Sequence, residues 1–266
     1  MQDFISDYIK AKNEVISFLN KNFKNLNIEE QLNKLKDYNF TQLAIEQNCD
    51  EDSTDIVKSI YFIIWHDVLP KLSSFDEMNE YYGGETLNTF NTLFQKDLYG
   101  IKKFYTESEA PNLYKKIQEF GKNYVTIGNF MLLPKKTLNN MSINQEKGSY
   151  KNSYKDFFDL FAVALFQSDD FNELKKINDF YFSKIDEKSF CEINFLDDYF
   201  EDNKFKIIFK HCYEDNKYYP YYHWKYKNPI LHKDEYKTFI EDYIETTTKI
   251  IEHRAEKICE KLKERL

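Results

Sequence analysis

The sequence predicts a mainly α-helical protein, a single large helical domain over residues 1–266 with one small β element. Apolar residues recur at spacings of three and four along most of the chain, which is the period of an amphipathic helix. Clear β character is confined to Tyr124–Ile127. Hydrophobic residues make up 42% of the chain, and its 24 Phe and 21 Tyr supply the bulk for a large core.

Helical spacing organises the first half of the chain. A helix over residues 3–24 places these residues on one face: Phe4, Tyr8, Ala11, Val15 and Leu19. A second helix carries Leu32 and Leu35, and a strongly apolar one runs over 56–68 until Pro70 stops it. Further helices are predicted over 87–98, before Gly100, and over 111–120, before Gly121.

The second half begins with the β segment, which runs into Gly128 and a long polar loop over 134–152. Ser153 then caps the most apolar helix, whose Phe157, Phe161 and Leu165 should be almost fully buried. Helical spacing continues over 171–181. The region 190–229 is irregular and aromatic, with a short strand at 205–209, and the domain can divide near 185–230. A long helix is predicted from Asp234 onward.

Composition excludes several classes of function. A net charge of -8 and a pI near 5.3 disfavour a dedicated nucleic-acid binder. The chain has no apolar stretch of ~20 residues and its start lacks the pattern of a secretory signal, so we expect a cytoplasmic protein without membrane contact. The four cysteines are irregularly spaced, which favours reduced thiols. Abundant Lys, Asn, Ile, Phe and Tyr, all with A/T-rich codons, indicate a low-GC bacterium or its phage.

Cofactor and metal motifs are missing from the sequence. It has no glycine-rich phosphate-binding motif, so no cofactor is predicted. The group His211, Cys212, His223 and His232 lacks the short paired spacings of a zinc site, and no metal is predicted. The acidic run at 50–52 lacks the spacing of a calcium loop and is expected to be a solvated turn.

The segment from Thr126 to Lys147 is the richest in motifs. Gly128 would supply a backbone conformation closed to other residues, and the amide of Asn129 would tie the loop backbone. Polar residues that could form a binding surface follow it: Asn139, Asn140, Ser142 and Asn144. A purely structural loop anchor is the alternative interpretation of the same pattern.

Three elements of the chain resemble those of a bacterial family of unknown function. They are Gly84-Glu-Thr-Leu-Asn-Thr-Phe90 with Glu85 and Asn88, Ile127-Gly-Asn-Phe130 with Leu133-Pro134, and Tyr154-Lys-Asp-Phe-Phe-Asp159 with Asp156 and Asp159. The resemblance spans residues 83–161 and implies no activity.

A narrower resemblance is carried by Ile127-Gly-Asn-Phe-Met-Leu-Leu133 and the residues that follow it through Lys147. This segment is similar to the end of the His-Asn-His nuclease domain of modification-dependent restriction enzymes. That domain uses a His as general base, an Asn to brace the loop and a metal ion to stabilise phosphoryl charge. The resemblance would make His66 the base, Asn129 the brace, and Asn139 or Asn140 a residue beside the metal. His66 is equally explained as a histidine at a helix end, favoured there by the helix dipole.

These observations predict a binding surface around residues 83–90, 126–147 and 156–159. The aromatic tract 218–226, with Tyr221 and Trp224, is a second candidate surface, for bases or for a partner. The leading function is recognition of a macromolecular partner, a protein rather than a nucleic acid, without catalysis and in the setting of phage–host conflict. A divergent metal-dependent His-Asn-His nuclease is the alternative.

Overall fold

The computed structural model describes residues 2–89, 105–148, 154–209, 213–214, 217–218 and 233–266. Over these residues the chain is mainly helical, which confirms the predicted fold class. The α-helices are α1 (Gln2–Asn22), α2 (Ile28–Leu35), α3 (Thr41–Gln47), α4 (Asp55–Trp65), α5 (Phe75–Tyr81), α7 (Pro111–Asn123), α8 (Ile143–Lys147), α9 (Phe158–Gln167), α10 (Asn172–Ile177), α11 (Asp179–Phe182), α12 (Glu187–Asn194) and α14 (Lys233–Arg265). No helix of this part of the chain is long and apolar enough to cross a membrane.

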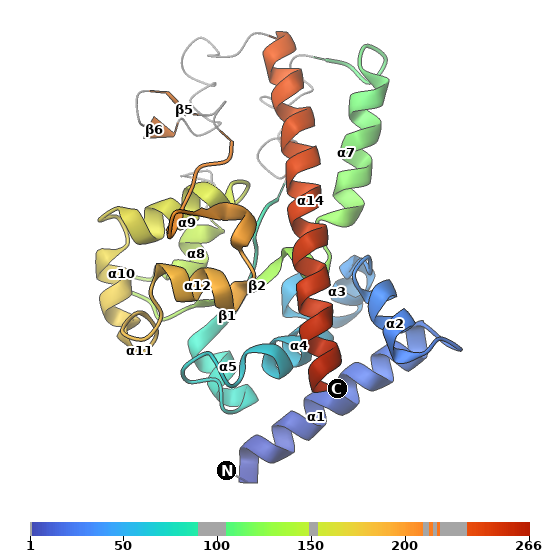
Figure 1. Ribbon diagram of the computed structural model, residues 1–266, viewed down its shortest axis with the longest axis vertical. Helices are drawn as coiled ribbons and strands as arrows, with labels where there is room; N and C mark the ends of the chain where they lie inside the picture. Colours follow the sequence, from blue (N-terminus) through green and yellow to red (C-terminus); the bar gives the residue numbers. More distant parts are fainter. Residues whose placement is uncertain (1, 90–104, 149–153, 210–212, 215–216, 219–232) are drawn as a thin grey trace.

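The long helix α14 is the axis of the molecule. It runs from top to bottom in Figure 1, with α7 beside its upper half, α1 crossing near its lower end and α8–α12 gathered on the left. Along its length α14 contacts α7, α2 and α4, and the short 3₁₀ turn η3 (Ile127–Asn129). Segments far apart in the sequence are therefore held together by one helix.

Side-chain caps explain where several helices begin. Asn27 caps α2: its Oδ1 accepts a hydrogen bond from the Glu30 backbone N at 3.0 Å, and the Glu30 carboxylate accepts one from the Asn27 backbone N at 2.9 Å. Ser74 begins α5 and Asp186 begins α12 in the same way, through a side-chain oxygen that accepts a backbone N–H.

The main β element joins two segments that lie far apart in the sequence. Strand β1 (Tyr82–Thr86) pairs antiparallel with β2 (Phe130–Pro134), so that Glu85 lies opposite Met131. Shorter antiparallel pairs join β3 (Phe200–Glu201) with β4 (Lys204–Phe205), and β5 (Tyr213–Glu214) with β6 (Lys217–Tyr218). The predicted strand at Tyr124–Ile127 is wrong, because this segment forms the turn that follows α7 and the first residue of η3. The strand predicted at 205–209 is reduced to its first residue, in β4.

Several helix limits also differ from the predictions. Helix α4 ends at Trp65, ahead of Pro70, and α7 continues through Gly121. The polar loop over 134–152 contains α8. Leu87–Thr89 are not helical, and the rest of the helix predicted there, like Ser153, lies outside the described residues. The next helix, α9, begins at Phe158.

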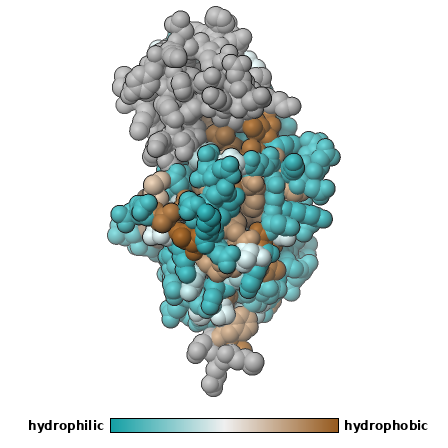
Figure 2. Space-filling model, turned by 90° about the vertical axis from the view of Figure 1, so that its left-hand side faces the viewer, coloured by the Kyte–Doolittle hydropathy of each residue, from teal (hydrophilic) through white to brown (hydrophobic). Residues whose placement is uncertain are grey.

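The described residues form two hydrophobic clusters. The larger contains α1, α4, β2 and most of α9, and the smaller joins α7 to the first half of α14. Phe161 and Leu165 lie in the larger cluster and Phe157 in the smaller, all at most 1% exposed, which confirms their predicted burial. Figure 2 shows a mostly hydrophilic surface broken by small hydrophobic patches. The prediction of one domain, with a division near 185–230, stays a prediction.

Three of the four cysteines are described. Cys191 and Cys259 are buried free thiols of the larger cluster, and Cys49 is a half-buried free thiol. Burial raises the pKa of the Cys191 and Cys259 thiols to about 12, so these side chains pack as neutral groups. Cys212 lies outside the described residues.

Candidate functional site

The three segments that carry the sequence motifs lie together around β1 and β2. After the paired strands, the Leu87 backbone N donates a hydrogen bond to the Asn129 carbonyl O at 2.7 Å. The Thr89 backbone N donates to the Lys155 carbonyl O at 3.2 Å, which joins residues 83–89 to the segment that leads into α9. The structure thus brings residues 83–89, 126–147 and 156–159 into one region of the fold, and Phe90 lies outside the described residues.

Asn129 ties backbone within this region. Its side chain is fully buried, and its Oδ1 accepts a hydrogen bond from the Asn88 backbone N at 3.0 Å. Its Nδ2 donates to the carbonyl oxygens of Asn88 at 2.6 Å and Tyr124 at 2.7 Å. These bonds use both ends of the amide on main-chain groups, which is the bracing role expected from the sequence.

Asn88 extends the bracing into α9. Its Nδ2 donates a hydrogen bond to the Tyr199 hydroxyl at 2.5 Å, and its Oδ1 accepts one from the Phe158 backbone N at 3.3 Å. Both side chains, Asn88 and Tyr199, are fully buried. Asn88 was expected on a binding surface, and the structure places it inside the molecule.

Asp156 and Asp159 are also fully buried. Asp156 accepts a hydrogen bond from the Thr89 hydroxyl at 2.5 Å. Asp159 Oδ2 accepts bonds from the backbone N of Ile208 at 2.8 Å and of Phe209 at 3.2 Å. These carboxylates therefore fix the loop before α9 and the chain after β4, rather than facing solvent as the predicted surface required. We call the buried polar residues of this region the polar network: Asn88, Thr89, Asn129, Lys147, Asp156 and Asp159.

Lys147 is the cationic member of the polar network. Its fully buried Nζ donates to the carbonyl O of Thr86 at 2.8 Å and of Lys155 at 3.4 Å. Burial lowers the pKa of Lys147 to about 8. The negative charges of Glu85 and Asp156 act in the other direction and raise this pKa, but less strongly. Burial also raises the pKa of the Glu85 carboxyl, which the positive charge of Lys147 opposes.

Asn144 and Ser142 position α8 against β1. The Asn144 Nδ2 donates to the Gly84 carbonyl O at 2.7 Å and to Glu85 Oε2 at 3.4 Å. Ser142 is buried and caps α8 by accepting a hydrogen bond from the Gln145 backbone N at 3.2 Å. Both residues were expected on the binding surface, and both hold the local structure.

Gly128 is required for a reason that differs from the expected one. The described glycines have no positive φ, so Gly128 supplies no special backbone conformation. A Cβ at this position would instead lie 2.0 Å from the Ile251 carbonyl O of α14. Nearby, the fully buried Arg254 donates from Nη1 to the carbonyl oxygens of Gly128 and Phe130, both at 2.7 Å. Burial lowers the pKa of Arg254 to about 10.

Asp52 faces β1 from the 3₁₀ turn η1 (Glu51–Ser53). The sequence suggested a solvated acidic turn, but Asp52 is buried, at 9% exposure. A Cβ on Gly84 would lie 3.0 Å from Asp52 Oδ1, which shows how closely the carboxyl approaches the strand. Burial and the negative charge of Glu85 raise the pKa of Asp52 to about 7, while a hydrogen bond from Ser53 lowers it.

His66 belongs to a different part of the molecule. It follows the last residue of α4, where its Nδ1 lies 3.0 Å from the Phe62 carbonyl O and its ring packs on Phe4 and Tyr8. Arg265 Nη1 lies 3.3 Å from the same nitrogen. Arg254, which contacts the segment around Asn129, precedes Arg265 by 11 residues on α14, a rise of about 16 Å. The structure does not bring His66 and Asn129 into one site.

Asn139 and Asn140 form the tip of a tight turn. Leu138 and Met141 exchange backbone hydrogen bonds of 2.8 and 3.0 Å, and the two asparagines between them have φ values of 53° and 63°. Positive φ at both central positions defines a type I′ turn, which favours Asn. Both residues are exposed, as a surface role requires. Tyr221 and Trp224 lie outside the described residues.

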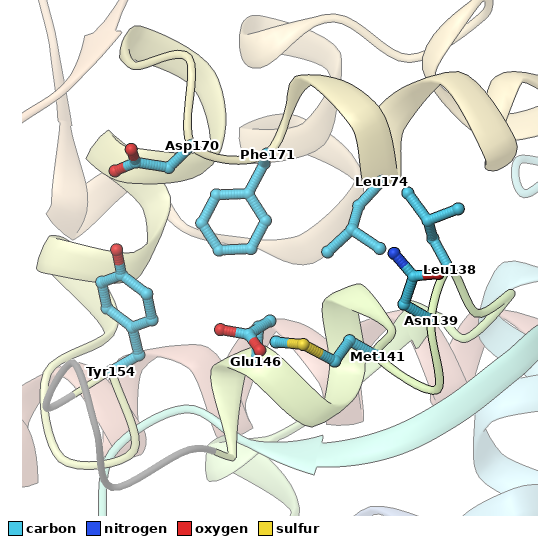
Figure 3. Close-up of a pocket in the computed structure, with 8 residues that line it drawn as sticks. All are labelled: Leu138, Asn139, Met141, Glu146, Tyr154, Asp170, Phe171 and Leu174. Atoms are coloured by element: carbon cyan, nitrogen blue, oxygen red, sulfur yellow. The ribbon is translucent and has the colours of Figure 1, made fainter.

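This turn borders a cavity of about 430 Å³, which we call the α8–α10 pocket. Its apolar lining comes from Leu138, Met141, Phe171 and Leu174, and its polar lining from Asn139, Glu146, Tyr154 and Asp170. Figure 3 shows Glu146 and Met141 facing Phe171 and Leu174 across the cavity, with the Tyr154 hydroxyl directed toward Asp170. Of the residues that the motifs single out, Asn139 lines the pocket.

Most residues that line this pocket, and the buried charged residues Asp52 and Arg254, were not predicted as site residues from the sequence. Glu146 and Asp170 look like ordinary solvated acids in the sequence. Arg254 left a signal, because it is one of only two arginines among 37 basic residues. Within the described ranges, no three His, Cys, Asp or Glu side chains gather to hold a metal ion.

The geometry therefore separates two parts. The polar network is buried and makes hydrogen bonds to backbone and neighbouring side chains, whereas the α8–α10 pocket beside it opens to the surface. The chain has no significant match to a protein-family model, a curated protein or a solved structure, so both resemblances stay predictions.

Proposed function

We propose that this protein binds a partner protein without catalysing a reaction, and that the partner contacts the surface around the α8–α10 pocket. One observation carries the proposal: most of the polar side chains of the motif segments are buried and brace the fold, whereas Asn139 and Asn140 are exposed beside the pocket. Asn129 makes three hydrogen bonds to main-chain groups, and Asp159 accepts three from backbone N–H groups. Such groups are not available to a substrate without unfolding the region.

A protein partner fits the pocket better than a nucleic acid does. Two carboxylates, those of Glu146 and Asp170, line the cavity, and the chain carries a net charge of -8. Both would repel phosphate groups, which usually meet a basic surface. Exposed apolar side chains such as Met141 beside polar groups are common where proteins bind each other.

Site-specific photo-crosslinking tests this proposal in the native cell. A benzophenone amino acid at Met141, which is 46% exposed beside the pocket, should cross-link to one protein species. The matched control is the same group at Ile45, which is 67% exposed on α3 and outside the α8–α10 pocket. Equal cross-linking at both positions, or none at Met141, would contradict the proposal.

The nuclease alternative is tested on the same purified protein. Added Mg²⁺ or Mn²⁺ should produce no cleavage of DNA or RNA if the protein only binds a partner. A general base contributes ~10²–10⁴-fold to a rate. Metal-dependent cleavage that is lost in His66→Ala, with the fold retained, would replace the binding proposal by the nuclease.

A further inference from the structure

We propose that the α8–α10 pocket receives an arginine side chain of the partner protein, an inference that rests on the proposed function. The pocket combines the features that a guanidinium on an aliphatic stem requires. Its cavity of about 430 Å³ has apolar lining residues for the stem and two carboxylates for the charge. Arginine suits such sites because its planar group carries five donors and is less strongly hydrated than an ammonium.

The carboxylates of Glu146 and Asp170 are free to pair with a cation from outside. Glu146 lies on α8 and Asp170 precedes α10, so the two acids line the pocket from different elements. Neither is engaged by a lysine or arginine within the described part of the chain. Asn139 adds an amide oxygen, a further acceptor for guanidinium N–H groups.

Two aromatic side chains, Tyr154 at 6% exposure and Phe171 at 2%, also line the pocket. The rings of Tyr154 and Phe171 have centroids 5.9 Å apart and are tilted by 44°. Cations bind ring faces within ≈6 Å, and guanidinium groups also stack on them. The molecule already contains such an arrangement, because Lys136 Nζ lies 4.7 Å from the Tyr81 ring centroid and 5.4 Å from that of Phe180.

Hydrogen bonds within the chain fix several segments that line the pocket. The turn at Leu138–Met141 is closed by two backbone hydrogen bonds, and the Ser142 cap fixes the start of α8. The Asp170 backbone N donates to the Ser168 hydroxyl at 3.2 Å. A site that needs little ordering loses less free energy on binding. The net charge of -8 would also speed the approach of a basic partner.

Methionine-methyl NMR gives a direct test with N-acetyl-argininamide as the probe. The chain has four methionines, of which Met141 lines the pocket while Met78 and Met131 are buried elsewhere in the core. The probe should shift the Met141 signal saturably and leave those of Met78 and Met131 in place. The shift should become smaller at high salt, because salt screens the attraction between the guanidinium of the probe and the carboxylates of the pocket. N-acetyl-citrullinamide has nearly the same shape without the charge and should shift Met141 far less, as should N-acetyl-lysinamide.

Charge-neutral variants locate the site. Glu146→Gln and Asp170→Asn should each weaken binding about two- to fivefold, the usual range for a partly exposed ion pair. Glu173→Gln removes an exposed acid of α10 that does not line the pocket and should leave binding unchanged. Unmoved Met78 and Met131 signals in each variant would show that the fold is intact.

Three outcomes would overturn the inference: no Met141 response to N-acetyl-argininamide, an equal response to the citrulline or lysine probe, or full binding in both pocket variants. A cross-link at Met141 without any probe response would overturn the arginine site and leave the proposed function standing. A probe response without any cross-linked protein would overturn the proposed function and leave the pocket's cation preference standing.

Discussion

Replacing Asp52 with Asn should stabilise the protein above pH 7. The carboxyl of Asp52 is buried against β1 and lies in the field of the negative Glu85. The hydrogen bond from the Ser53 hydroxyl, at 3.0 Å, does not offset these two effects. The native fold therefore favours the protonated form of this side chain.

The size of the effect follows from the pKa. Asp52 has an ordinary pKa of 3.8, which the fold raises to about 7. Each pKa unit corresponds to about 1.4 kcal/mol, so ionising Asp52 in the native state costs about 4 kcal/mol. Well below pH 3.8 the group is protonated in both states and there is no cost. Between pH 4 and 7 only the native state keeps the proton, so stability falls as pH rises.

The Asn side chain cannot ionise, so the variant should keep at high pH the stability that the original protein has at low pH. Urea unfolding followed by circular dichroism, at several pH values from 4 to 9, measures the difference between the two proteins. The difference should be below ~1 kcal/mol at pH 4 and reach about 4 kcal/mol at pH 8. Asp50→Asn is the matched control, because this neighbouring side chain is exposed and should change stability by less than ~0.5 kcal/mol.

The reasoning is refuted if the difference between Asp52→Asn and the original protein does not vary with pH. It is also refuted if Asn destabilises the protein at pH 8. Either result would mean that Asp52 is ionised in the native state and is stabilised there by an interaction that outweighs burial and the charge of Glu85.

Three further changes test the bracing and the core. Asn129→Ala removes three hydrogen bonds to buried main chain and should cost about 2–4 kcal/mol in urea unfolding, whereas Asn140→Ala, at an exposed turn, should cost under ~1 kcal/mol. Gly128→Ala places a Cβ 2.0 Å from the Ile251 carbonyl O and should lower the melting temperature by several degrees; an unchanged value would show that α14 can move away freely. Phe161→Ala should cost ~3–5 kcal/mol, and a loss below ~1 kcal/mol would place this ring outside the core.

The helices were predictable because their apolar spacing is set by the element itself. All five residues that predicted the first helix face lie on α1, and three of them, Ala11, Val15 and Leu19, are fully buried. The strands were harder, since a strand depends on its partner. Residues 82–86 include two glycines, which are poor strand formers, yet they pair with an apolar segment more than 40 residues away.

The convergence of the motif segments was predictable, but their role was only partly so. Asn88, Asp156 and Asp159 are polar residues, which are usually exposed, so the sequence suggested a surface. Their partners are mainly backbone groups and a Tyr hydroxyl from distant segments, and such partners leave no pattern in the sequence. The bracing role of Asn129 was predicted because a Gly-Asn pair between two segments is typical of a loop anchor.

The long helix α14 also has a consequence for how the chain folds. It contributes Phe239 and Tyr243 to the smaller hydrophobic cluster and Ile258 and Leu262 to the larger one. Near its end the Arg265 carbonyl O accepts a hydrogen bond from the Tyr8 hydroxyl, 257 positions away in the sequence. Contacts of such high sequence separation close very large loops, which slows folding compared with other helical proteins. The backbone amides of the α14 residues that belong to the two clusters should therefore exchange with deuterium only when the described core opens as a whole.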